Sequence, residues 1–255
     1  MREIRAGLRL QFSLLRRNPG HLLIFVTVPF FSAIFISGIE EAGRSSLVGY
    51  AVLGPAMIGL WAVSLDLGGS IIDAERMQQT FELQVIAPSS FSRVLVGRVL
   101  AVTGIGMLTF PETILFAEFA FGIRLHVGQP AVMVLTLTVT AIAMAGTSTA
   151  MATLFVAARA ARRFANVLGY PFYIIGGLLV PITLLPVWVR PLGWLTYLYW
   201  SAGLLRASLS SQPVAYLGWR LVAVLGLGVF AYLIGLKLCV RVIDVLRRQG
   251  VVGLS

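Results

Sequence analysis

Long apolar stretches alternate with short polar or proline-containing intervals along the whole chain. A helix needs about 20 predominantly apolar residues to cross a bilayer, and six stretches meet this requirement. They run from His21 to Ile39, Leu47 to Ile72, Val94 to Phe121, Ala131 to Ala158, Val167 to Leu185 and Leu217 to Val240. The pattern predicts an all-α polytopic membrane protein with six transmembrane helices, in which residues 1–255 form a single transmembrane domain.

The composition supports the same class. Of the 255 residues, 58% are apolar and 12% are charged, and the mean hydropathy is +0.91. A soluble domain has about 45–50% apolar and about 25% charged residues, so a soluble enzyme, a disordered protein and a secreted disulfide scaffold are excluded. The single cysteine and the two distant histidines exclude an intrachain disulfide and a histidine metal site.

The basic residues predict the orientation. If the N-terminus is cytoplasmic and six spans alternate, 15 of the 20 Lys and Arg residues lie on the cytoplasmic side. Short cytoplasmic loops carry an excess of these residues, so we expect both termini in the cytoplasm and the basic helix ends against anionic lipid headgroups. The arginines on the outer side are Arg44, Arg124, Arg190, Arg206 and Arg220. Their dispersal over helix ends argues against a nucleic-acid partner.

Residues 1–20 are predicted to form an amphipathic helix, because at about 100° per residue the apolar and basic side chains fall on opposite faces. The apolar ones are Ile4, Leu8, Phe12 and Leu15, and the basic ones are Arg2, Arg5, Arg9 and Arg16. Such a helix lies along the membrane surface. It either fixes the topology alone or also rests on a partner protein as a connecting helix, and the number of arginines favours the second role.

The interval 73–88 after the second span predicts a cytoplasmic helix that ends before Pro88. Apolar side chains suited to a partner's groove are ringed by charged ones. The apolar set is Met77, Phe81, Leu83 and Val85, and the charged set is Asp73, Glu75, Arg76 and Glu82. A helix lying on the bilayer is the alternative, but such a helix carries more basic residues. The pattern therefore favours docking to a partner.

Residues 181–206 lie between the fifth and sixth spans. Pro181, Pro186 and Pro191 forbid one straight helix, yet the interval is too apolar and aromatic for a free loop. Trp and Tyr prefer the membrane interface, and irregular backbone at that depth must be covered by protein or line a water-filled cavity. The aromatic residues are Trp188, Trp194, Tyr197, Tyr199 and Trp200. We expect two short re-entrant helices in the outer leaflet.

Three carboxylates fall inside predicted spans, where each costs about 2.5–3.5 kcal/mol on insertion scales. Asp66 lies within reach of cytoplasmic water, and Glu118 lies near the outer end. Glu112 is the deepest. Its carboxylate either lines a substrate path or a buried interface, or forms a structural hydrogen bond to a neighbouring helix.

The fourth span carries small residues on one side, which permits close helix approach. They are Ala141, Ala145, Gly146, Thr149 and Ala150. We expect this face to pack within the chain, and not to form a dimer motif.

Catalytic and nucleotide-binding motifs are missing from the sequence. There is no GxxxxGK[ST] phosphate loop, and the sole lysine, Lys237, lies in an apolar span. GxSxG and HExxH motifs are also absent. We therefore expect that the chain is not an enzyme by itself and binds no cofactor or metal of its own.

Two motifs in this topology resemble the membrane subunits of ABC-2 type transporters. Residues Asp73–Leu100 are similar to the family's coupling-helix segment, with Gln79 where glycine is usual. The matching positions are Asp73-Ala-Glu-Arg76, Thr80, Glu82-Leu83, Pro88, Ser90 and Val96-Gly-Arg-Val-Leu100. Residues Gly176–Arg206 are similar to the segment before the last span, with Tyr197 where proline is common. The matching positions there are Pro181, Leu185-Pro186, Trp188 and Arg206.

The resemblance implies a separate cytoplasmic ATPase that binds ATP and Mg²⁺, normally in two copies under two membrane subunits. It assigns ATPase coupling to Glu75, Arg76, Thr80, Phe81, Glu82 and Leu83. It assigns the connecting helix to Arg5, Arg9 and Arg16, and the outer gate to Pro181, Pro186, Trp188, Trp194 and Tyr197. Glu112 and Asp66 are candidates for polar groups along the substrate path.

The implied function is ATP-driven export of a hydrophobic drug, antibiotic, other natural product or lipid across the bacterial cytoplasmic membrane. The chain resembles daunorubicin-type antibiotic-resistance permeases, and its partner permease is an identical or a paralogous chain. Three alternatives stay open: export of a polysaccharide or glycolipid, a proton-coupled secondary carrier that uses Glu112, and a membrane anchor that transports nothing.

Overall fold

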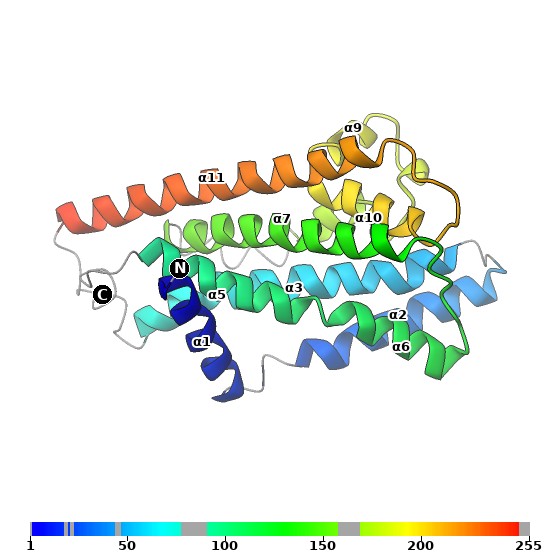
Figure 1. Cartoon of the computed structure of the whole chain (residues 1–255), viewed down its shortest axis with the longest axis horizontal. Coiled ribbons are helices and arrows are strands. Elements are labelled where there is room, and N and C mark those ends of the chain that lie inside the picture. Colours follow the sequence, from blue (N-terminus) through cyan, green and yellow to red (C-terminus); the bar gives the residue numbers. More distant parts are fainter. Residues whose placement is uncertain are drawn as a thin grey trace.

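The computed structural model describes residues 2–17, 20, 23–43, 47–77, 91–157 and 169–249. The described part is helical and contains no strand (Figure 1). Its elements are α1 (Arg2–Arg17), α2 (Ile24–Glu41), α3 (Val48–Met77), α5 (Phe91–Gly106), α6 (Thr109–Phe121), α7 (Pro130–Ala157), a helical stretch at 169–175, η3 (Ile182–Leu184), α9 (Arg190–Gly193), α10 (Tyr197–Ala207) and α11 (Leu217–Gln249).

Five helical segments of the described chain are long and apolar enough to cross a membrane. They are Ile24–Glu41, Val48–Leu65, Arg93–Phe121, Pro130–Leu154 and Leu217–Leu238. The all-α polytopic class is therefore confirmed. The long helices run side by side, and α1 and the last turns of α11 lie toward the same end of the bundle (Figure 1). We call this the terminal end. The connections 122–129 and 208–216 lie at the opposite end.

The predicted fifth span, Val167 to Leu185, is only partly described, because residues 158–168 lie outside the described part. The helix of residues 169–175 ends in a Schellman motif, in which Leu178 N–H donates to Tyr173 O (2.9 Å) and Gly177 N–H to Ile174 O (3.0 Å). Gly177 has φ of 67°, which glycine adopts without strain. The prediction that this helix continues to Leu185 is wrong, because the helix ends at residue 175, ten residues earlier, just before two glycines.

The predicted third span is divided at residues 107–108 into α5 and α6. Pro111 has no N–H, and its ring clashes with the carbonyl four residues earlier, that of Met107. Phe110 N–H donates instead to Met107 O in a tighter turn (3.2 Å). The Thr109 hydroxyl donates to Gly106 O and to Ala56 O of α3, both at 2.8 Å. The bend is therefore held against α3.

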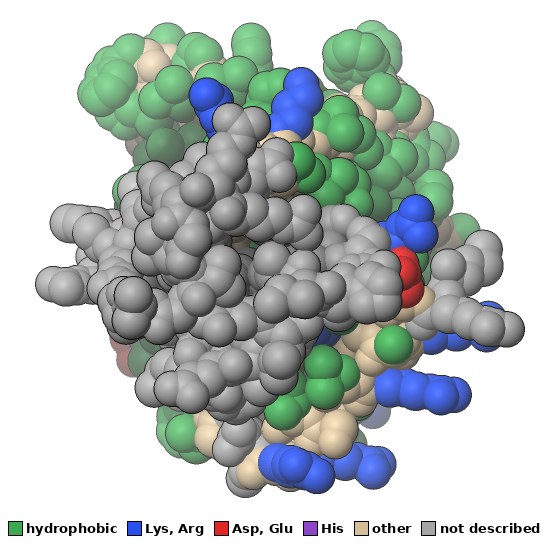
Figure 2. All heavy atoms as spheres, turned by 90° about the vertical axis from the view of Figure 1, so that its left-hand side faces the viewer, with side chains coloured by type: hydrophobic (Ala, Val, Ile, Leu, Met, Phe, Trp, Pro, Cys, Tyr) green, Lys and Arg blue, Asp and Glu red, His purple; other side chains and the backbone are tan. Residues whose placement is uncertain are grey.

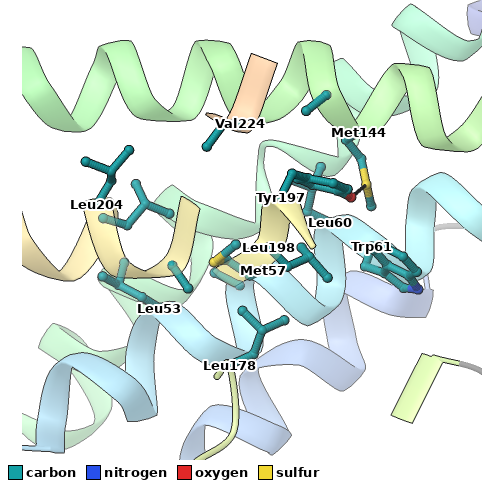
Figure 3. Packing of buried hydrophobic residues seen from close by; sticks show 14 of the residues in the cluster. Leu53, Met57, Leu60, Trp61, Met144, Leu178, Tyr197, Leu198, Leu204 and Val224 are labelled. Atoms are coloured by element: carbon teal, nitrogen blue, oxygen red, sulfur yellow. Dashed lines mark hydrogen bonds between the residues drawn. The ribbon is translucent and has the colours of Figure 1, made fainter. Parts of the chain in front are cut away.

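The main apolar core lies where α3, α7, α10 and α11 meet. Figure 3 shows Leu53, Met57, Leu60 and Trp61 of α3 facing Met144 of α7, Leu204 of α10 and Val224 of α11. In the α3 span 72% of residues are buried, compared with 17% in the α2 and α11 spans. The central position thus belongs to α3, while α2 and α11 leave apolar faces uncovered, as expected for helices that meet lipid tails or another subunit.

Helices α7 and α11 approach so closely that their backbones touch. A Cβ atom added at Gly146 would lie closer than 3.0 Å to Gly228 O, and one at Gly235 would lie 2.7 Å from Ala150 Cα. Real Cβ atoms essentially never lie this close to another heavy atom. The predicted packing of the small-residue face within the chain is confirmed for Gly146 and Ala150.

Candidate functional site

Helix α1, the predicted connecting helix, crosses α5 through two glycines. A Cβ atom at Gly7 would lie closer than 3.0 Å to Val94 O, and one at Gly97 equally close to Ile4 O. Glycine is the residue that allows two helix backbones to come this close. The crossing fixes α1 on α5 by main-chain contact.

A buried polar pair lies beside this crossing. The Arg98 side chain is 3% exposed, and its Nε–H donates to Gln11 Oε1 at 3.0 Å. A buried charge is costly unless it is hydrogen-bonded, so Gln11 of α1 helps to satisfy Arg98 of α5. At the helix start, Arg93 Nη1 lies 3.3 Å from Glu3 Oε2 in a more exposed ion pair. These contacts set the register of α1 on α5.

The buried face of α1 is not the one that hydropathy indicates. Gly7, Gln11 and Leu15 are buried at four-residue spacing, whereas Phe12 is 50% exposed. The shift arises because the α5 backbone at Val94 leaves no room for a side chain at Gly7, and the buried Arg98 selects an amide at Gln11. The helix itself is confirmed, and its basic face is exposed.

The predicted connecting-helix arginines Arg5, Arg9 and Arg16 all lie on the exposed face. Figure 2 views the terminal end and shows basic side chains projecting from it at several places. In the described part of the chain, α1 thus presents a basic surface at this end. Its contact with a membrane or with a partner protein stays a prediction.

The predicted coupling helix begins differently. Residues 73–77 continue α3, which ends at Met77, so the predicted helix boundary at Asp73 is wrong. The apolar window ends at residue 72, but nothing at Asp73 interrupts the helical backbone. Glu75 and Arg76 therefore lie in the last turn of α3. Thr80, Phe81, Glu82 and Leu83 lie outside the described residues, and the coupling role of all six residues stays a prediction.

An aromatic cluster joins α3 to the broken segment. The Trp61 ring lies 5.4 Å from the Phe172 ring, 6.3 Å from the Tyr197 ring in a stacked arrangement and 6.4 Å from the Tyr173 ring edge-on. The Tyr197 hydroxyl donates to Met144 Sδ of α7 at 2.6 Å (Figure 3). Trp61 is thus the point where α3, residues 169–175 and α10 meet.

Arginines hold the irregular segment at residues 176–196 by its carbonyl groups. Arg206 Nη1 donates to Gly177 O at 3.0 Å, and its guanidinium lies 4.0 Å from the centroid of the Tyr50 ring. Arg190 donates to Thr183 O and Leu185 O at 2.7 and 3.0 Å. Backbone groups outside a helix need such partners when water is absent. The short helices α9 and α10 lie where proline forbids a continuous helix, and their re-entry into the membrane stays a prediction.

The predicted outer-gate residues do not form one group. Trp188 and Trp194 are 78% and 58% exposed, and Pro186 is also exposed. Pro181 is half-buried, and Tyr197 is 6% exposed within the core. Tyr197 can be buried because Met144 Sδ accepts a hydrogen bond from its hydroxyl group. A gating role for these residues stays a prediction.

Glu112 and Asp66, the two carboxylates predicted along the substrate path, are separated along the bundle. Glu112 lies in the first turn of α6, next to the α5–α6 bend, and its Oε2 atom is buried without a hydrogen-bond partner in the described chain. Asp66 lies in the second half of α3, and its side chain is outside the described part. Neither role predicted for them is tested by this arrangement.

Gly97, Arg98 and Trp61 are not among the predicted site residues. The signals for the first two are their place in the Val96-Gly-Arg-Val-Leu100 match and a Gly-Arg pair inside an apolar stretch, where a charge must find a buried partner. Trp61 lies in a continuous apolar window, and no local pattern distinguishes it from its neighbours. In the described part of the chain, no three His, Cys, Asp or Glu side chains form a group able to hold a metal ion.

Replacing Gly97 by alanine should separate α1 from α5, because the added methyl group would overlap Ile4 O. Such overpacking costs about 1–3 kcal/mol. The matched change Gly104→Ala on the same helix meets nothing within 4 Å. We expect a lower thermal unfolding midpoint in detergent for Gly97→Ala and an unchanged or higher one for Gly104→Ala, since alanine favours helix. Equal unfolding midpoints for the two variants would show that the α1 and α5 backbones are not in close contact at Gly97.

The family of the chain follows from its sequence and agrees with this architecture. The model of the ABC-2 type transporter family matches residues 2–210, from the first residue of α1 to just beyond α10. No curated protein matches the chain. The match covers more than half of the 255 residues. The chain therefore belongs to the ABC-2 type transporter family and is the transmembrane component of an ABC transporter.

Proposed function

We propose that this chain is the membrane subunit of an ATP-driven exporter, which moves a hydrophobic drug, antibiotic, other natural product or lipid out of the cytoplasm or inner leaflet. ATP and Mg²⁺ are bound by two copies of a separate ATPase at the terminal end. A second permease, identical or paralogous, completes the membrane part. Both termini of this chain face the cytoplasm of a bacterial cell.

The observation that carries the proposal is the position of α1 in a chain that matches the ABC-2 family. The helix is fixed to α5 by the Gly7–Gly97 crossing, and Leu15 packs with Val63 of α3 and Val102 of α5. Its exposed arginines lie at the same end of the bundle as the last turn of α3 (Figures 1 and 2). A partner that pushes on α1 and on the residues after Met77 would thereby move α3 and α5 together.

The apolar surface supports a hydrophobic substrate and a second permease. Phe30 and Ile34 of α2 are 66% and 68% exposed, and Phe119 of α6 is 84% exposed. Sugar export needs polar groups along the path, and apart from Arg98 the buried polar side chains of the described spans carry only the single hydroxyl group of Ser or Thr. The polysaccharide alternative is therefore the weaker one.

The test is export of daunorubicin, a fluorescent hydrophobic drug, from cells or proteoliposomes that contain this chain and its ATPase. Phe81→Ala and Glu82→Ala should reduce export at least tenfold while ATP hydrolysis by the complex changes less than twofold, because the coupling contact is lost and the ATPase site is not. Gln84→Ala, a polar neighbour outside the assigned contact set, should transport normally. Intact export in both coupling variants would contradict the assignment.

The same assay separates the alternative classes. Export by an ABC transporter stops with vanadate, which inhibits the ATPase. A proton-coupled carrier that uses Glu112 would continue in vanadate and stop with a protonophore. A membrane anchor would export no compound under either condition. Membership of the ABC-2 family favours the first outcome.

A further inference from the structure

A cavity of about 560 Å³ opens at the end of the bundle opposite α1. It lies between the first turn of α3, the C-terminal half of α10, the first turn of α11 and the turn at Gly177. Its size falls within the range of about 300–1,000 Å³ that is usual for small-ligand sites. Its lining includes Tyr50, Tyr199, Ser210, Arg206 and Arg220.

Among the described residues, two guanidinium groups and no carboxylate line this cavity. Arg206 is fixed by Gly177 O and the Tyr50 ring. A Cβ atom at Gly203 would lie 2.6 Å from Arg220 Nη2, so the absence of a side chain there lets Arg220 reach α10. In the described part of the chain neither guanidinium forms an ion pair, whereas Arg124 at the same end pairs with Glu118 at 3.2 Å. The cavity therefore carries uncompensated positive charge.

Burial and mutual repulsion of the Arg206 and Arg220 guanidinium groups cost free energy. Burial lowers the pKa of Arg206, Tyr50 raises it, and the neighbouring Arg220 lowers it further. Arginine stays protonated even so, since its ordinary pKa is above 12. An anion between the two side chains would offset both their desolvation and their repulsion. Two planar guanidinium groups also match the geometry of phosphate oxygens.

The position of the cavity relative to the membrane favours a lipid as its ligand. Tyr50 is the third residue of α3 and Arg220 the fourth of α11, so both lie in the first turn of a membrane-spanning helix. That is the level of the headgroups. Tyr216 and Trp219, next to Arg220, are 84% and 67% exposed, as expected for aromatic residues at the interface. Val222, two residues further along α11, is 58% exposed and offers apolar surface to an acyl chain.

We propose that Arg206 and Arg220 form a binding site for the headgroup phosphate of an anionic phospholipid, in the leaflet at the end opposite α1. The phosphate lies between the two guanidinium groups, and the acyl chains run along the exposed face of α11. The site is independent of the compound that the transporter carries. A free phosphate ion offers the same oxygen atoms but has no acyl chains. This difference separates the two possible ligands, a phospholipid and inorganic phosphate.

The test is the binding of phosphatidylglycerol to the purified full-length chain in detergent, counted by native mass spectrometry over a lipid titration. Arg220→Gln should weaken phosphatidylglycerol binding at least fivefold. Arg220 is chosen because it donates no hydrogen bond to the described chain, so its loss leaves the Arg206–Gly177 contact intact. Arg220→Lys keeps the positive charge but loses the planar guanidinium group, which can donate two hydrogen bonds to one phosphate. Its affinity for phosphatidylglycerol should therefore lie between that of Arg220→Gln and that of the unaltered chain.

Arg124→Gln is the matched control, because it removes one positive charge from the same end but outside the cavity. Its lipid binding should be unchanged. Equal binding by Arg220→Gln and the unaltered chain would overturn the site, and so would equal weakening by Arg124→Gln. Release of the lipid by millimolar inorganic phosphate would overturn the lipid as the ligand. A thermal unfolding midpoint for each variant shows that reduced binding does not come from unfolding.

Discussion

Gly228→Val should strongly destabilise the bundle, while Gly226→Val two residues away should leave it nearly unchanged. A Cβ atom at Gly228 would lie closer than 3.0 Å to Ala143 Cα of α7, whereas carbon atoms attract each other best at about 3.5–4.0 Å. The obstacle is backbone and not the end of a flexible side chain, so α11 must move away from α7. The contact with Gly146 on the facing helix would be lost with it.

The control shares the helix and the change in side chain. A Cβ atom at Gly226 meets nothing within 4 Å, and the helix propensity of valine acts equally at both positions. Overpacking of about 3 kcal/mol at Gly228 lowers the thermal unfolding midpoint by roughly 6–12 °C in a chain of this size. The midpoint in detergent, followed by tryptophan fluorescence, measures this difference. Similar midpoints for the two variants would mean that α7 and α11 do not touch through their backbones.

Hydropathy predicts the spans well where one apolar window equals one helix. The windows that begin at Leu47, Ala131 and Leu217 agree with helices that begin at Val48, Pro130 and Leu217. The end of α3 is predicted less well, because Asp73, Glu75 and Arg76 are polar but remain helical. Hydropathy reports the preference of side chains for lipid, and a helix that leaves the membrane can continue in water.

The packing of α1 on α5 could not be predicted from hydropathy, because its determinants are backbone contacts and one buried polar pair. Gly7 and Gly97 have no side chains to produce a periodic signal, and Gln11 is polar although it is 5% exposed. In the sequence, Arg98 is one of the basic residues that predict the orientation in the membrane. In the structure its side chain is buried against Gln11. Such positions are recognised only when the partner helix is known.

The broken segment was predicted in outline but not in detail. Proline spacing predicts an interruption over residues 181–206, but the break begins at residue 176, inside the predicted fifth span, and α10 is the longer of the two short helices. The aromatic residues divide between environments for a reason that the sequence does not contain. Tyr197 has Met144 Sδ as an acceptor inside the bundle, whereas Trp188 lies 78% exposed.

Trp61→Ala should cost about 3–5 kcal/mol, the usual loss when a large buried aromatic side chain is truncated. The side chain is 2% exposed, and three aromatic rings from residues 169–175 and α10 contact it. Its removal would leave a cavity where α3 meets the broken segment. Residues 169–175 form a short helix, so loss of this contact should release that segment before the long helices separate.

Two variants distinguish the aromatic contact from the loss of any tryptophan. Trp61→Phe keeps a ring in the cluster and removes Nε1, which is buried without a hydrogen-bond partner in the described chain, so it should lose less than half as much stability. Trp219→Ala truncates a side chain that is 67% exposed and should change the unfolding midpoint little. Proteolysis of the folded chain in detergent, with cleavage sites read by mass spectrometry, should show earlier cutting within residues 169–196 in Trp61→Ala alone. If Trp61→Ala and Trp219→Ala lose equal stability, the meeting point of α3, α10 and the broken segment is not at Trp61.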